Sequence, residues 1–154
     1  MKLTFAFWTR YLQVISLFFA FLGFGWLLIG SADPFGLYDR AFARAFWQQD
    51  TLPPDAKRAF SFIIGPLGAT NAGYFLLQYF IAKHAYANRQ PWGYRAIMTA
   101  FFVWFVADTT FSLLRGAYFN VLLANLPSLV AMLPIVFTAG YFNGPHRSVS
   151  TRWR

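Results

Sequence analysis

The sequence predicts an all-α membrane protein, a four-transmembrane-helix bundle with a short interfacial helix in its first outer loop. Hydrophobic residues make up 58% of the 154 residues and charged residues only 12%, whereas soluble domains carry about 25% charged residues. Four apolar stretches reach the length of roughly 20 residues that a helix needs to cross a bilayer. Basic residues stand singly at the ends of these stretches, where anionic headgroups favour them, so we expect membrane lipids as partners and no nucleic acid.

The four spans are expected over about residues 9–31, 57–86, 92–115 and 118–142, within a single transmembrane domain covering 1–154. The first span carries no charge between Tyr11 and Ile29. It exceeds the roughly 7–15 apolar residues of a signal peptide core. We therefore expect a retained transmembrane helix rather than a cleaved leader.

The loop after the first span has a helical pattern of its own, over about residues 34–48. Asp33 can cap this helix, with Pro34 at its first position. Aromatic residues then recur at three- and four-residue spacing, at Phe35, Tyr38, Phe42 and Phe46. This pattern fits either a helix lying in the outer interface with its aromatic rings facing the membrane or a lid that packs on the bundle.

The charges predict the orientation of the chain. Four crossings place both termini and the loop between the second and third spans on one side, which then holds eight basic residues and no acid. The opposite side holds five basic residues and four of the five Asp. Because basic residues concentrate in cytoplasmic segments, we expect cytoplasmic termini. Abundant Arg, scarce Lys and no Glu favour a bacterial source, and hence a bacterial inner membrane.

Small residues in the second span predict a close helix contact. Gly65, Ala69 and Gly73 recur at four-residue spacing, with Gly68 and Ala72 on an adjoining face. Lipid supplies no hydrophobic reason for helices to associate, so small residues that let two backbones approach supply the contact. We expect the Gly65–Ala69–Gly73 face to pack on another helix, in this chain or in a neighbour.

Asp108 is the one acid inside a predicted span, and such groups normally face the bundle interior with a partner. Arg115 follows seven residues later on the same helical face, which makes a direct or water-bridged ion pair plausible. Matching depths across antiparallel helices adds polar neighbours, so the expected cluster is Asp108, Arg115, Asn125, Asn71, Thr70 and Ser112, with Thr109 beside it. Nearer the other membrane surface, Gln13 and Gln78 are expected to hydrogen-bond. The Asp108 cluster is either a structural network that fixes helix register or a site for a headgroup, substrate or proton.

No motif for chemistry stands out. The chain has no Cys, no HExxH sequence and no pair of carboxylates on one helix, so neither a metal site nor a cofactor is predicted. His84 and His146 lie away from the middle of the spans, which argues against haem.

Three functions therefore remain open. The leading one is a non-catalytic subunit of a larger membrane complex or of a self-associating assembly. The alternative is a protein or enzyme that binds a lipid, a quinone or another apolar ligand at Asp108. The third is a channel or a proton-coupled carrier, which has little support because the polar residues do not form a continuous path.

Overall fold

A computed structural model describes residues 4–142 of the chain. Its elements follow in the order α1 (Phe5–Ile29), α2 (Leu37–Trp47), α3 (Pro54–Ile81), η1 (Ala82–Tyr86), α4 (Pro91–Leu114), α5 (Tyr118–Asn120), η2 (Val121–Asn125), α6 (Leu126–Val136) and η3 (Ala139–Phe142). Of these, η1 and η2 are π-helical turns that continue α3 and connect α5 to α6. Four of the helical segments are long and apolar enough to span a membrane: Phe5–Ile29, Pro54–Tyr86, Pro91–Leu114 and Tyr118–Val136. The predicted fold class is confirmed, and the chain is an integral membrane protein.

The last span differs from the predicted one. It is not a single α-helix over 118–142 but α5, η2 and α6, and it ends at Val136. The π-helical turn comes just before Pro127. Proline has no backbone N–H to donate, and its ring crowds the preceding turn of a helix. At the other end, the Thr138 hydroxyl and the Thr138 N–H both donate to the Ile135 carbonyl, at 2.6 and 3.0 Å, which closes the last turn of the span.

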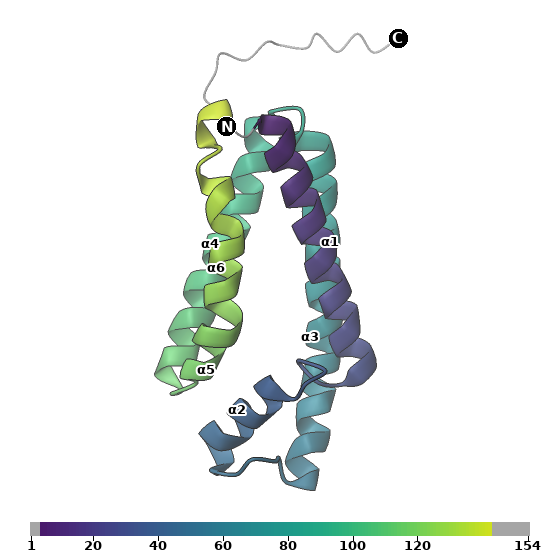
Figure 1. Cartoon of the computed structure of the whole chain (residues 1–154), viewed down its shortest axis with the longest axis vertical. Helices are drawn as coiled ribbons and strands as arrows, with labels where there is room; N and C mark the ends of the chain where they lie inside the picture. Colours follow the sequence, from purple (N-terminus) through teal and green to yellow (C-terminus); the bar gives the residue numbers. More distant parts are fainter. Residues whose placement is uncertain (1–3, 143–154) are drawn as a thin grey trace.

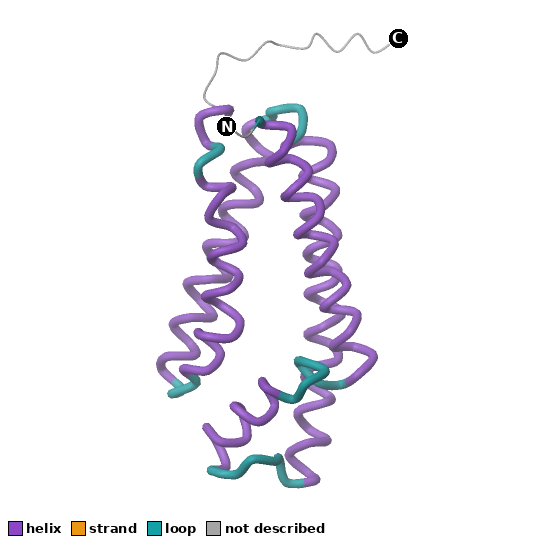
Figure 2. The backbone as a smooth tube through the Cα atoms, in the orientation of Figure 1, coloured by secondary structure: helices purple, strands orange, loops and turns teal. Residues whose placement is uncertain are grey.

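The four spans form two helix pairs that lean against each other at one end (Figures 1 and 2). The first pair is α1 with α3, and the second is α4 with the α5–η2–α6 span. The pairs meet where α1 and α4 begin and where η3 lies, which we call the terminal end. They separate toward the opposite end, which we call the α2 end because α2 lies there (Figure 1).

The first pair is held by direct backbone contact. Gly23 of α1 and Gly68 of α3 are buried against each other, and a Cβ on Gly23 would lie 2.5 Å from the Gly68 carbonyl oxygen. Ala72 is buried beside them, whereas Ala69 and Gly73 are exposed. Within the chain, α3 therefore contacts α1 through the face of Gly68 and Ala72, which adjoins the predicted Gly65–Ala69–Gly73 face. Of the predicted packing residues only Gly65 is buried, at the edge of the contact and near Leu27.

The hydrophobic core lies in the terminal half, where both pairs contribute to it. Its buried members include Phe5, Leu12, Tyr86, Ile97, Phe101, Met132, Ile135 and Phe142. Tyrosine hydroxyls tie α6 into this core, because Tyr11 donates to the Ala131 carbonyl at 2.7 Å and Tyr86 to the Thr138 hydroxyl at 2.8 Å. The terminal half is thus the part of the molecule in which all four spans are fixed to one another.

At the α2 end, α2 bridges the two pairs. Its residue Phe42 packs against Phe60 of α3 at 4.7 Å between ring centroids, and Tyr38 packs against Phe119 of α5 at 5.1 Å. The N-cap residue is Gly36 and not Asp33 as predicted, although the Asp33 side chain accepts backbone hydrogen bonds from Leu37 at 2.9 Å and Tyr38 at 2.6 Å. The helix itself begins at Leu37, after Pro34. The contacts of Tyr38 and Phe42 fit the lid interpretation, whereas the exposed Phe35, Leu37 and Phe46 fit a helix that lies in the interface.

Some residues used to predict orientation lie outside the described part of the chain. These are Lys2, Arg147, Arg152 and Arg154. Among the described residues, Arg10, Lys83, Arg89 and Arg95 belong to the terminal half of the molecule, and Asp33, Asp39, Asp50 and Asp55 to the α2 end. Both ends of the described chain lie at the terminal end, as four crossings require (Figure 1).

Candidate functional site

Asp108 lies on the face of α4 that meets the last span. Phe101 and Ser112 lie on this face, and both are buried. The opposite face carries Val103 and Val106, which are exposed, as expected of side chains that face lipid. Asp108 itself is half-buried, so its carboxylate stands at the edge of the interface rather than in its interior.

The Asn120 amide is the centre of the polar network around Asp108. Its Nδ2 donates to Asp108 Oδ2 and to Ser112 Oγ, both at 2.8 Å. Its Oδ1 accepts a hydrogen bond from the Tyr38 hydroxyl at 2.7 Å. A carboxylate can only accept, which fixes the amide group in this orientation. We call Tyr38, Asp108, Ser112 and Asn120 the Asp108 network.

Through Tyr38, the network reaches from α4 across α5 to α2. Burial, followed by the negative charge of Asp108 and then of Asp39, raises the pKa of Tyr38 to about 12. The phenol therefore keeps its proton at any physiological pH and remains a hydrogen-bond donor. Since the ring also packs on Phe119, α2 is held by a hydrogen bond and an aromatic contact to neighbouring residues of α5.

A second polar pair lies beside the network. Asn125, which is fully buried, donates through Nδ2 to the Thr109 hydroxyl at 2.8 Å. Its Oδ1 is buried and has no hydrogen-bond partner among the described residues. An unsatisfied buried acceptor costs about 1–3 kcal/mol, so this pair is a weaker join between α4 and the last span than the Asn120 hydrogen bonds.

Arg115 does not pair with Asp108. Among the described residues the ion pairs are Arg44–Asp50 and Arg58–Asp55, and the Arg115 guanidinium instead lies 5.5 Å from the centroid of the Phe111 ring. The expectation of an ion pair assumed that helical geometry continues through residue 115. The α4 helix ends at Leu114, and Arg115 has φ −97° and ψ 4°, so its side chain leaves the face that carries Asp108. The Asn120 amide occupies the place predicted for the cation.

Asn71 and Thr70 belong to the other helix pair. Asn71 Nδ2 donates to the Phe19 carbonyl of α1 at 3.0 Å, and the Thr70 hydroxyl donates to the Pro66 carbonyl of its own helix at 3.0 Å. The structure thus brings together Asp108 and Ser112 of the predicted cluster, places Asn125 beside them on Thr109, and leaves Asn71 and Thr70 apart. Depth matching assumed one closed bundle, whereas the two pairs separate toward this end (Figure 2).

The predicted contact between two glutamines is also replaced. Gln78 Nε2 donates to Ser16 Oγ at 3.0 Å, and Ser16 in turn donates to the Leu12 carbonyl at 2.6 Å. Gln13 is half-buried and lines a pocket near the terminal end. Ser16 lies on the same face of α1 as Leu12, Ala20 and Gly23, so the helix periodicity could have identified it as the residue that meets α3.

Two residues of the Asp108 network, Asn120 and Tyr38, were not among the residues predicted for the cluster. Asn120 is the first amide of the last span, and it reaches Asp108 only because a short turn over residues 115–117 brings α5 back along α4. Tyr38 is the one member of the aromatic stripe of α2 that carries a hydroxyl. That hydroxyl could have indicated a polar partner in the membrane-facing part of the fold.

The site can hold hydrogen-bonding groups but shows no catalytic constellation. Within residues 4–142, no three side chains of His, Cys, Asp or Glu gather as metal ligands. Asp108 has Oδ2 bonded to Asn120, while Oδ1 receives no hydrogen bond from the described residues. The network therefore offers one acceptor oxygen to a group from outside the chain. Comparison of the chain with protein-family models, with curated proteins and with solved structures finds no match in any of the three.

Proposed function

We propose that the protein binds an amphiphile at the α2 end, next to Asp108. The ligand class is a lipid, or another apolar molecule, whose polar end carries a hydroxyl or an amine. In this proposal α2 covers the site, and the ligand's apolar part lies along the helix pairs where these separate. The observation that carries it is the free Oδ1 of Asp108 in a membrane-spanning helix.

An ionised carboxylate at membrane depth costs about 2.5–3.5 kcal/mol on insertion scales, and such groups are normally partnered. Asp108 receives one hydrogen bond from Asn120 and none from a cation among the described residues. A ligand that donates a hydrogen bond or brings a positive charge would supply the missing partner. An ionised carboxylate repels a ligand that offers only acceptors, which favours the reduced, hydroxyl-bearing form of a quinone over its carbonyl form.

The test is binding of a long-chain amine to the purified protein in a mild detergent, measured by native mass spectrometry. Dodecylamine should bind, and Asp108→Asn should weaken its binding at least about tenfold, because a charge-assisted hydrogen bond contributes about 1.5–3 kcal/mol. Asp50→Asn removes a carboxylate that is exposed on the surface and should leave binding unchanged. Circular dichroism monitors the fold of each variant. Equal binding by wild type and Asp108→Asn would remove Asp108 from the site.

A second function, as a subunit of a larger or self-associated assembly, rests on a different observation. Ala69 and Gly73 are exposed on α3, and a Cβ on Gly73 would meet nothing within 4 Å. Small residues four apart allow a helix from another polypeptide to approach closely. Ala69→Leu with Gly73→Leu should then dissociate the assembly on native mass spectrometry. A solitary monomer after gentle extraction of the wild type would argue against this function.

We also propose that the termini face the cytoplasm of a bacterial inner membrane, on the basis of the charge distribution described above. The absence of Cys makes a labelling test direct. Gln49 at the α2 end and Asn88 at the terminal end are both exposed. Gln49→Cys should react with an impermeant maleimide in intact spheroplasts, and Asn88→Cys only after permeabilisation. The reverse pattern would invert the orientation.

A further inference from the structure

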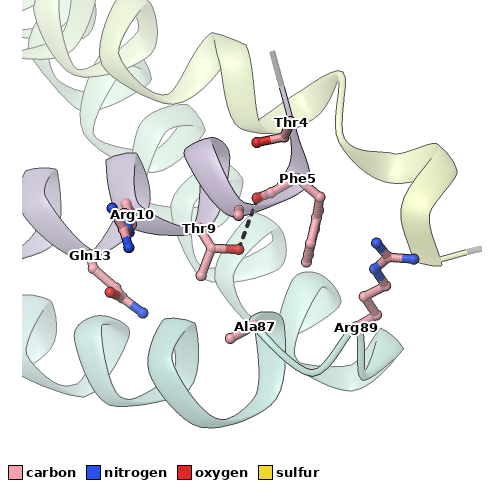
Figure 3. Close-up of a pocket in the computed structure, with 8 residues that line it drawn as sticks. Thr4, Phe5, Thr9, Arg10, Gln13, Ala87 and Arg89 are labelled. Atoms are coloured by element: carbon pink, nitrogen blue, oxygen red, sulfur yellow. Dashed lines mark hydrogen bonds between the residues drawn. The ribbon is translucent and has the colours of Figure 1, made fainter. Parts of the chain in front are cut away.

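A pocket of about 550 Å³ that carries two arginines lies at the terminal end, at the opposite end of α4 from Asp108. It is lined by Thr4, Phe5, Ala6, Thr9, Arg10, Gln13, Ala87 and Arg89. Its volume lies in the range of roughly 300–1,000 Å³ that is typical of small-molecule sites. Figure 3 shows Arg10 and Gln13 at one end of the pocket and Arg89 at the other, with Thr9 and Phe5 between them.

The charge of this pocket is positive without compensation. All five acids of the sequence fall between positions 33 and 108, and none of them lines the pocket. Neither Arg10 nor Arg89 takes part in an ion pair among the described residues. Both arginines are exposed, so their guanidinium groups are available to an anion.

Arg89 is held in place by its surroundings. Its guanidinium carbon lies 4.9 Å from the Phe5 ring centroid and 5.6 Å from that of Tyr141, which is cation–π geometry. Its backbone has φ +54°, a left-handed conformation that is uncommon for a residue other than Gly. The turn is closed by a hydrogen bond from the Arg89 N–H to the Tyr86 carbonyl at 2.8 Å. The turn and the two rings thus direct a cation toward the start of α1.

The shape of the pocket relates it to the bilayer. Arg10 and Gln13 lie five and eight residues beyond Phe5, about 7.5 and 12 Å along the axis of α1. The pocket therefore runs from the helix end, where Arg89 lies, into the first span. Phe5, Ala6 and Ala87 give it apolar walls among these donors. A free anion would fill only the part of the pocket between the arginines, whereas a lipid has a phosphate for the arginines and a glycerol and chains for the remaining length.

We infer that this pocket binds the headgroup of an anionic phospholipid. The phosphate lies between Arg10 and Arg89, Gln13 or Thr4 donates to the ester or glycerol oxygens, and the acyl chains follow the outside of α1. Basic pockets among transmembrane helices recognise anionic headgroups in this way. The site is separate from Asp108, in residues and in charge, so either proposal can fail without the other.

The experiment offers the full-length protein a choice between two lipids. The protein is held in micelles that contain equal amounts of phosphatidylglycerol and phosphatidylcholine with the same acyl chains, and the lipids retained are counted by native mass spectrometry. The wild type should retain phosphatidylglycerol. Arg10→Gln with Arg89→Gln should reduce its affinity about thirtyfold, and each single variant about fivefold, since each basic group near the surface contributes about 1 kcal/mol.

Arg95→Gln is the matched control. It removes the same charge at the terminal end from a residue that is exposed and outside the pocket lining, so it should leave the lipid preference unchanged. Arg89→Lys keeps the positive charge and should lose less affinity than Arg89→Gln. A folding defect caused by replacing Arg89 would instead lower the affinity of both variants. The inference is overturned if the wild type shows no anionic preference, or if Arg95→Gln lowers it as far as Arg10→Gln does. It is also overturned if glycerol phosphate displaces the lipid at equal concentration, because the pocket would then be a phosphate site.

Discussion

Side-chain amides join both helix pairs of this protein, but only the first pair adds a close backbone contact. In the first pair, α1 and α3 approach until Gly23 and Gly68 leave no room for a Cβ, and the amides of Asn71 and Gln78 donate across the contact. In the second pair, α4 and the last span are joined by side-chain amides, with Asn120 on Asp108 and Asn125 on Thr109. Both solutions answer the same problem, because lipid gives apolar helices no reason to associate.

The difference shows what each join permits. A backbone contact between glycines has no substitute conformation, so it holds the first pair rigidly. An amide can exchange one partner for another, and each interhelical hydrogen bond in a membrane contributes only about 0.6 kcal/mol on average. The second pair is therefore the better place for a site that accepts a ligand, and it is the pair that carries Asp108.

Breaking the glycine contact should have the largest effect. In Gly68→Ala the new Cβ would lie inside the contact distance of the Gly23 carbonyl oxygen and 2.8 Å from the Leu27 nitrogen, and both obstacles are backbone atoms. We expect a loss of about 2–3 kcal/mol in the free energy of unfolding, measured by denaturation from mild detergent into dodecyl sulfate. Gly73→Ala adds the same methyl group where nothing lies within 4 Å and should cost nothing. Similar losses in the two variants would disprove the contact.

The amides of the second pair should not contribute equally. Asn120→Leu leaves Asp108 Oδ2, Ser112 and Tyr38 without their partner, and we expect a loss of about 1–2 kcal/mol. Asn125→Leu removes one hydrogen bond together with an acceptor that had no partner, so its effect should be close to zero. The same denaturation assay compares them. A larger loss for Asn125→Leu than for Asn120→Leu would contradict this order.

A smaller effect is expected where α2 joins the second pair. Tyr38→Phe keeps the ring on Phe119 but removes the hydrogen bond to Asn120, at a cost of about 0.6–1 kcal/mol. Amide hydrogen exchange in α2 should accelerate, while exchange in α3 should not. The raised pKa of Tyr38, about 12, stabilises the docked helix fully below pH 10. This contribution is lost as the pH rises from the ordinary tyrosine value of about 10 through 12, and a phenolate beside Asp108 and Asp39 is repelled, so in strong alkali α2 of the wild type should be less protected than α2 of the uncharged Tyr38→Phe.

The smallest effect concerns the Asp33 hydrogen bonds at the start of α2. Burial favours the protonated form of Asp33, but backbone hydrogen bonds from Leu37, Tyr38 and Phe35 outweigh it and lower its pKa. The Asp33 carboxylate therefore contributes stability above the ordinary carboxyl pKa of about 3.9 and loses it as the pH falls through the lowered value. Asp33→Ala should cost about 0.5 kcal/mol. Exchange in α2 of this variant should match the wild type in acid and exceed it at neutral pH, and a constant ratio across pH would contradict this role of Asp33.

The sequence predicted the fold well because hydrocarbon thickness constrains every span in the same way. The lengths of the apolar stretches and the charges at their ends were enough to locate the four spans, and the spacing of the aromatic residues located α2. The end of the last span was missed because Pro127 and Pro134 break a pattern that is still apolar as far as Phe142. Apolar composition marks where a helix can be, but it does not reveal where the backbone changes its hydrogen bonding.

The candidate site was predicted only in part, for a geometric reason. Asp108 and Ser112 are four residues apart on one helix, so periodicity alone places them together. Asn71 was assigned to the same cluster by depth, and depth does not say which of two separating helix pairs a residue belongs to. Arg115 was assigned by extending a helix one residue too far. Side chains near helix ends depend on the turn that follows, which the sequence pattern did not show.

The position of α2 has a consequence for synthesis of the protein. The Tyr38 hydroxyl and the Asn120 amide that it binds are 82 residues apart in the chain. At about 5–20 residues per second, the ribosome needs about 4–16 s to complete Asn120 after Tyr38. The α3 helix, which ends at Ile81, is completed about midway through that interval and can then pack on α1, whereas α2 still lacks its second anchor. We therefore expect α2 to dock late in biogenesis, after the fourth span has arrived.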